Sequence, residues 1–143
     1  MYILDTNVIS ELRKANTCKA HQNVIRWAKN VPSTSLYISV ITVLELEMGI
    51  LSKERKDPPQ GAILRNWLND HVLPAFSERI LPIDTTVAQR CAKIHVPDHH
   101  ADRDALIAAT TIVYGMTLVT RNVADFVKTG ADLLNPWEAS CLN

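Results

Sequence analysis

The sequence predicts an α/β fold in which short, mainly parallel strands alternate with amphipathic helices. Short apolar runs that end at polar residues recur along the chain, and segments with apolar residues at helical spacing separate them. Strands that alternate with helices are joined by right-handed crossovers, which place the strands parallel in one sheet. The 143 residues, 47% of them hydrophobic, suffice for the core of a single domain spanning residues 1–143.

Each predicted strand is a short apolar run. The first, residues 2–4, ends at the carboxylate of Asp5. The later strands are expected at residues 36–39, 80–83 and 117–120, with a last edge element at 132–137. Because parallel strands end at the same edge of a sheet, Asp5 and the turn at residues 120–122 are expected to emerge together there. Ligands collect at that edge in open α/β sheets.

The predicted helices follow from apolar spacing and from end signals. Asn7 is a suitable N-cap for the first helix, Asp84 or Thr85 caps a later one, and Gly115 is suited to the position just after a helix. The expected helices are residues 8–14, 21–29, 42–52, 60–76, 85–95 and 102–114.

Charge and cysteine content limit the function classes. Lysine plus arginine equal aspartate plus glutamate at 15 each, so the chain as a whole has no attraction for a polyanion. Any contact with nucleic acid must use bound cations or local patches. One such patch could comprise Arg13, Lys14, Lys19, Arg26, Lys29, Lys53, Arg55 and Lys56, although solvated helix faces would look the same.

The expected location is the cytoplasm. Cys18, Cys91 and Cys141 are odd in number and lack C-x-x-C spacing, which fits a reducing compartment. The chain starts directly with a strand, without a signal-peptide pattern, and no apolar stretch reaches the length of a membrane span. We therefore expect no association with a membrane.

Acidic residues recur where secondary-structure elements begin or end. Asp5 follows the first strand, Glu45 and Asp104 lie near the starts of helices, and Asp125 follows the strand at 117–120. If these carboxylates meet, they repel one another unless a hard dication such as Mg²⁺ or Mn²⁺ neutralises them. Such a site could activate a water molecule against a phosphodiester.

Each acid could also have a purely structural role. Thr42 and Glu45 fit the capping box S/T-x-x-E, and Asp104 lies in a first helical turn, where the helix dipole favours negative charge. Asp125 could cap a turn before Phe126. Such a role suits Asp5 less well, since a buried acid without a partner is costly.

Histidines form a second group of potential metal ligands. His95, His99 and His100 could be combined with Asp98 or Asp102 into a transition-metal site. Their spacing matches no compact ligand pattern, which favours ordinary surface histidines.

Four motifs in order carry a family resemblance. They are Leu4-Asp5-Thr6-Asn7-Val8-Ile9; Ser39 to Leu46 with Gly49; Asp104 to Thr110; and Leu118 to Asn122 through Asp125-Phe126, with Asn135-Pro136-Trp137 near the end. Together they resemble the PIN-domain family and, within it, the VapC and FitB-like toxins of bacterial toxin-antitoxin pairs. The resemblance spans nearly the whole chain and implies a PIN-like α/β/α sandwich with a mainly parallel central sheet.

The resemblance also implies an activity and its residues. The expected activity is that of an Mg²⁺ or Mn²⁺-dependent endoribonuclease that cleaves a structured RNA, such as tRNA or rRNA, at a single-stranded loop. Asp5, Glu45 and Asp104 match the first three family acids and would be the metal ligands. Asn122 stands where many relatives carry a fourth acid, so either Asn122 or Asp125 would complete the catalytic set. Two further residues, Thr6 and Thr120, would support ligands or phosphate by hydrogen bonding.

The implied partners are a cognate antitoxin that inserts a segment across the acidic site, a second copy of the chain in a homodimer, and operator DNA bound only through the antitoxin. Two alternatives remain open. A non-enzymatic interaction module is possible because Asn122 lacks a charge. A phosphatase with a strand-end aspartate normally has a second Asp two residues on, where this chain has Asn7.

Overall fold

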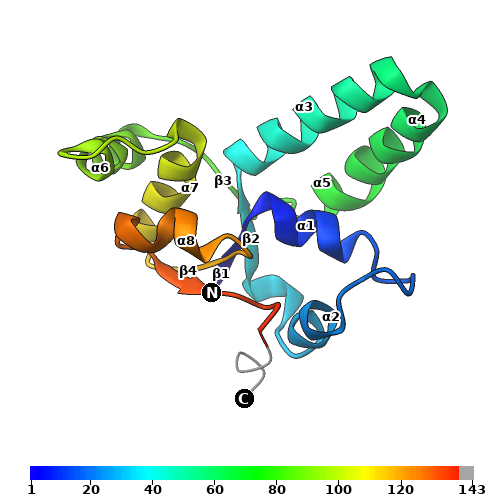
Figure 1. Ribbon diagram of the computed structural model, residues 1–143, viewed down its shortest axis with the longest axis horizontal. Helices are drawn as coiled ribbons and strands as arrows, with labels where there is room; N and C mark the ends of the chain where they lie inside the picture. The colour runs from blue at the N-terminus through cyan, green and yellow to red at the C-terminus, as the bar shows by residue number, and fades with distance from the viewer. Residues whose placement is uncertain (139–143) are drawn as a thin grey trace.

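The computed structural model describes residues 1–138 and contains a five-stranded sheet in the order β3-β2-β1-β4-β5 (Figure 1). The strands are β1 (Tyr2–Leu4), β2 (Leu36–Ser39), β3 (Ile80–Leu81), β4 (Thr117–Val119) and β5 (Asp132–Leu134). Every pairing between neighbouring strands is parallel, which confirms the predicted sheet. Of the three cysteines, Cys141 lies outside the described residues.

Helices connect the strands and cover both faces of the sheet. They are α1 (Thr6–Leu12), α2 (Gln22–Lys29), α3 (Val40–Lys56), α4 (Pro58–Trp67), α5 (Leu73–Ala75), α6 (Thr85–His95), α7 (Asp102–Val113) and α8 (Val123–Phe126). Helices α6, α7 and α8 gather on one side of the sheet, and α1 to α5 on the other (Figure 1). Among the described helices, none is long and apolar enough to cross a membrane.

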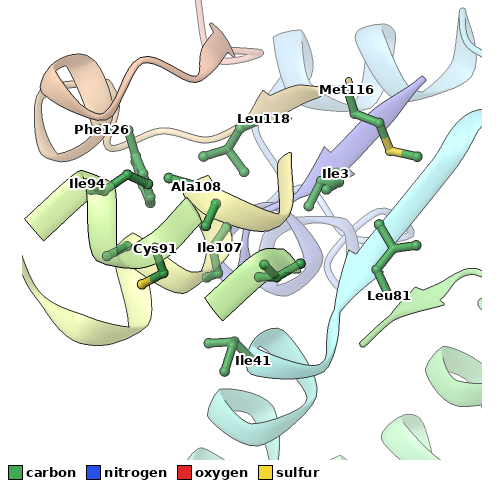
Figure 2. Packing of buried hydrophobic residues seen from close by; sticks show 13 residues of the cluster. Ile3, Ile41, Leu81, Cys91, Ile94, Ile107, Ala108, Met116, Leu118 and Phe126 are labelled. Carbon is green, nitrogen blue, oxygen red and sulfur yellow. The ribbon is translucent and has the colours of Figure 1, made fainter. Parts of the chain in front are cut away.

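The alternation of side chains along the central strands divides the core in two. Ile3 and Leu118 point into a cluster with residues of α6, α7 and α8 (Figure 2). Their neighbours Leu4 and Val119 point into a second cluster with residues of α1 to α5. Because successive strand residues face opposite sides of a sheet, an unbroken apolar strand is the pattern of a sheet buried on both faces. The expected α/β/α sandwich is confirmed.

Several predicted boundaries were wrong. Helix α3 starts at Val40 rather than at residue 42, because the Ser39 hydroxyl accepts the N–H of Ile41 at 3.0 Å and caps the helix. The segment 60–76 is not one regular helix. A π turn, Leu68–Val72, separates α4 from α5, and this wider turn places both of its end residues in the core. Gly115, with φ of 64°, does follow α7 as predicted.

Candidate active site

Asp5 connects the two central strands to the start of α1. Its backbone N–H donates to the carbonyl of Val119 at 2.9 Å, which continues the pairing of β1 with β4. Its carboxylate accepts the N–H of Thr6 at 2.8 Å and the hydroxyl of Thr120 at 2.8 Å. Only 7% of the residue is exposed. Asp5 is therefore the N-cap of α1, and the prediction of Asn7 as its N-cap was wrong.

Asn7 has a different role, which was not predicted from the sequence. Its side-chain amide lies 3.4 Å from both Asp5 Oδ2 and Thr120 Oγ1, and its carbonyl oxygen lies 3.4 Å from the N–H of Arg121. Asn7 therefore bridges the ends of β1 and β4 beside the buried acid. Its place in the motif Asp5-Thr6-Asn7 was the available signal.

Glu45 joins the same site from the second turn of α3. Its Oε1 accepts the hydroxyl of Thr6 at 2.7 Å, and Thr6 Oγ1 lies 3.4 Å from Thr42 Oγ1. Glu45 and Thr42 are both inside the helix, whose cap is Ser39. The structural alternative of a capping box for Glu45 is therefore excluded, and the carboxylate faces the end of β1 instead.

A cation on α7 also contacts Glu45. Arg103 Nε lies 3.7 Å from Glu45 Oε2, and its side chain is 49% exposed. This ion pair was not predicted, because no sequence spacing relates residues 45 and 103. Its exposure means that solvent screens the pair and that it stabilises the fold little.

Four carboxylates act on one another at this edge of the sheet. Burial raises the pKa of Asp5, hydrogen bonds from Thr120 and Thr6 oppose the rise, and the charges of Glu45 and Asp125 add to it. Burial also raises the pKa of Asp104, followed by the charges of Asp5, Asp125 and Glu45, while Arg103 opposes the rise. Helices α3, α7 and α8 thus each bring an acid towards the end of β1.

The fourth charge of this group comes from Asp125 rather than from Asn122. Asn122 is exposed, and its side chain does not cap α8. Its backbone N–H instead donates to Thr120 Oγ1 at 3.0 Å. Asp125 lies in α8, a short helix where the sequence had predicted only a turn, and its charge acts on both Asp5 and Asp104.

The chemistry of these donors fits a hard dication. Asp5, Glu45, Asp104 and Asp125 present carboxylate oxygens, the ligand type that Mg²⁺ and Mn²⁺ prefer. In the described part of the chain, Arg103 is the one basic side chain found in an ion pair with these acids. The cluster therefore keeps an excess of negative charge, which a dication would offset.

A groove leads away from the acidic cluster. It has a volume of about 370 Å³, and Thr6 and Glu45 lie at its wall together with residues of α1, α3 and α4. Its basic lining residues are Arg13 and Lys53, and the guanidinium of Arg13 lies 5.9 Å from the ring centre of Trp67. Positive charge and an aromatic ring thus adjoin an acidic site.

Comparison with known proteins decides the family. The family model described as PIN domain matches residues 2–131. The chain belongs to the PIN domain family. This match includes the strand end at Asp5, Glu45 on α3, and Asp104 and Asp125 on α7 and α8.

Other PIN domain proteins resemble this chain over almost its full length. It is 36% identical to the VapC ribonuclease Y4jK of Sinorhizobium fredii, over 96% of the chain and 99% of the relative. It is 34% identical to the toxin FitB of Neisseria gonorrhoeae, again over 96% and 99%. The crystal structure of FitAcB from Neisseria gonorrhoeae superposes with a TM-score of 0.86 at 32% identity, and the match covers 96% of this chain and 99% of that one.

Proposed function

We propose that this PIN domain is the toxin of a toxin-antitoxin pair and acts as an Mg²⁺ or Mn²⁺-dependent endoribonuclease. The observation that carries the proposal is the convergence of Asp5, Glu45, Asp104 and Asp125 at the carboxyl edge of the sheet. The relatives named VapC ribonuclease and toxin FitB support it. The proposed substrate is a structured RNA, such as tRNA or rRNA, cut in a single-stranded loop.

Each residue has a proposed role. Asp5, Glu45 and Asp104 hold the ion, and Asp125 adds negative charge beside them. When bound, the ion lowers the pKa of a water molecule and offsets the charge that develops on the phosphodiester. Thr120 and Thr6 orient the carboxylates of Asp5 and Glu45 through their hydroxyl groups. Asn122 contributes its backbone N–H to Thr120 rather than a ligand.

The preference for a loop has a steric reason. A phosphodiester must approach carboxylates of which Asp5 is only 7% exposed, and a flexible single strand reaches such a site without disruption of a duplex. The groove lined by Arg13, Lys53 and Trp67 would hold the strand next to the cut, with the basic residues near phosphates.

Cleavage of a hairpin RNA tests the activity. We expect the purified chain with Mg²⁺ to cut a hairpin in its loop and to leave a duplex of the same stem intact, and we expect EDTA to stop the reaction. Sequencing of RNA ends after brief expression would identify the cellular target. Equal cleavage in EDTA, or preferred cleavage of the duplex, would contradict the proposal.

The groove makes a prediction of its own. Replacing Arg13 or Lys53 with alanine is expected to raise KM about tenfold, equivalent to about 1.4 kcal/mol, and to leave kcat unchanged, because neither residue lies among the acids. Steady-state kinetics on the hairpin RNA would measure both constants. Lys93→Ala, a change at an exposed lysine of α6 on the other side of the sheet (Figure 1), serves as the control. A fall in kcat without a change in KM would exclude the groove as a site of RNA binding.

The proposed partners follow the same reasoning. A cognate antitoxin would block the acidic site. Because this chain has no net charge that would attract DNA, operator DNA would be bound by the antitoxin. The homodimer has a candidate surface on α3, where Leu44, Met48 and Leu51 are 45%, 49% and 58% exposed at helical spacing. We place the toxin in the cytoplasm, with its RNA.

Asp125 supplies the charge that Asn122 lacks, which weakens the alternative of a degenerate, non-enzymatic site.

A further inference from the structure

Two histidines and an aspartate meet where the chain passes from α6 to α7. His95 is the last residue of α6, Asp102 is the first of α7, and His99 lies in the loop between them. The Nε2 atoms of His95 and His99 lie 3.5 and 3.6 Å from the same oxygen, Asp102 Oδ1. The two rings are stacked with their centres 4.4 Å apart, so both nitrogens face one carboxylate.

We propose that His95, His99 and Asp102 bind a transition-metal dication of the Zn²⁺ type at a site separate from the acidic cluster. Imidazole nitrogen and carboxylate oxygen are both zinc ligands. Two ligands about 2.1 Å from a tetrahedral ion lie about 3.4 Å apart, close to the spacings seen here. The three ligand atoms all lie within 4.8 Å of one another. Water completes the coordination.

The proton on His95 sets the cost of binding. The N–H of His100 donates to His95 Nδ1 at 3.2 Å, so neutral His95 carries its own proton on Nε2, towards Asp102. Binding releases that proton to solvent, Nδ1 takes up a proton, and the His100 amide turns to water. Loss of this one hydrogen bond lowers the affinity for the ion about fivefold to tenfold. The free energy gained from three ligands to a dication is larger than this loss.

This site is distinct from the acidic cluster although both use the first turn of α7. Asp102 and Asp104 are two residues apart on the helix, which places them about 200° apart around its axis. Asp104 therefore projects towards Asp5, and Asp102 towards the loop. Ala101 gives this end of α7 no side-chain cap, so a bound ion would fix the turn from which Asp104 projects.

Calorimetric titration of the chain without a histidine tag tests the proposal. In an excess of MgCl2, added to compete for the acidic cluster of the proposed function, ZnCl2 is expected to bind with one ion per chain. His99→Ala and Asp102→Asn are each expected to weaken binding at least about tenfold. Both side chains are exposed, at 74% and 78%, so these variants should melt at the temperature of the unmodified chain.

Two matched variants distinguish this site from Zn²⁺ binding elsewhere on the chain. His100→Ala removes an imidazole from the same loop but keeps the backbone amide, so Zn²⁺ binding should persist. Asp5→Asn should also bind Zn²⁺ normally, even if RNA cleavage is lost. Absence of Zn²⁺ binding by the unmodified chain, equal binding by His99→Ala, or loss of binding in Asp5→Asn would each overturn the proposal.

Discussion

Replacing Asp5 with asparagine is expected to abolish RNA cleavage while the chain stays folded. The substitution keeps the size of the side chain. Its amide oxygen can still accept the N–H of Thr6, and its NH2 group can donate to Thr120 Oγ1, but the most buried charge of the cluster is removed. Loss of about 4 kcal/mol of transition-state stabilisation would lower kcat/KM roughly a thousandfold. Cleavage of the hairpin RNA and growth arrest on expression would measure the effect.

An acid at the opposite edge of the sheet provides the control. Asp132 begins β5 and is exposed, so Asp132→Asn changes the same net charge without reaching the cluster. This variant should cleave RNA at the normal rate. Full activity of Asp5→Asn, or equal loss in both variants, would disprove the role of Asp5.

The second large effect is that of Mg²⁺ on the thermal stability of the unmodified chain and of Asp5→Asn. Without a metal, Asp5→Asn is expected to be more stable than the unmodified chain at neutral pH, because burial raises the pKa of Asp5 and the fold disfavours its charged form. Saturating Mg²⁺ should reverse that order. An ion at 100 times its Kd stabilises the folded state by about 2.7 kcal/mol, and only a chain with its ligands intact gains this. Thermal denaturation in EDTA and in MgCl2 would show the crossing.

Salt and pH supply the checks on this reversal. KCl at matched ionic strength should reproduce little of the Mg²⁺ effect, since it only screens the charges. A pKa raised above 3.8 contributes stability that is complete below 3.8 and lost as pH rises through the folded value. The advantage of Asp5→Asn in EDTA should therefore shrink as pH falls towards that value. An equal Mg²⁺ shift in both proteins would exclude Asp5 as a ligand.

Most of the fold could be predicted from local sequence patterns, because most strands coincide with short apolar runs and most helices with apolar residues at helical spacing. The apolar run before Asp5 is a strand, and the spacing before Gly115 is a helix. Errors arose where neighbouring signals compete. Ser39 and Thr42 both suit a helix start, and Ser39, the last residue of β2, provides the cap, so that α3 follows the strand directly.

The sequence pointed to the acids of the candidate site and to Thr6 and Thr120 as supporting hydroxyl groups, but not to the other side chains that contact them. Asp5, Glu45 and Asp104 stand in motifs that the sequence displays. The contacts of Asn7 with Thr120, and of Arg103 with Glu45, join residues far apart in the chain and depend on how the helices cross the sheet edge. No periodicity encodes such contacts.

The threonine hydroxyls have a consequence for the proton inventory of the proposed reaction. Thr120 uses its one hydroxyl proton on Asp5 and accepts the N–H of Asn122, and Thr6 uses its own on Glu45. Since Thr6 cannot also donate to Thr42, the proton between those two must come from Thr42. The hydroxyl protons of Thr6 and Thr120 are thus both held in hydrogen bonds to carboxylates. The proton that the departing ribose oxygen takes up must then come from water or from a carboxyl group. Replacing Thr6 or Thr120 with valine would therefore displace an acid rather than remove a proton donor.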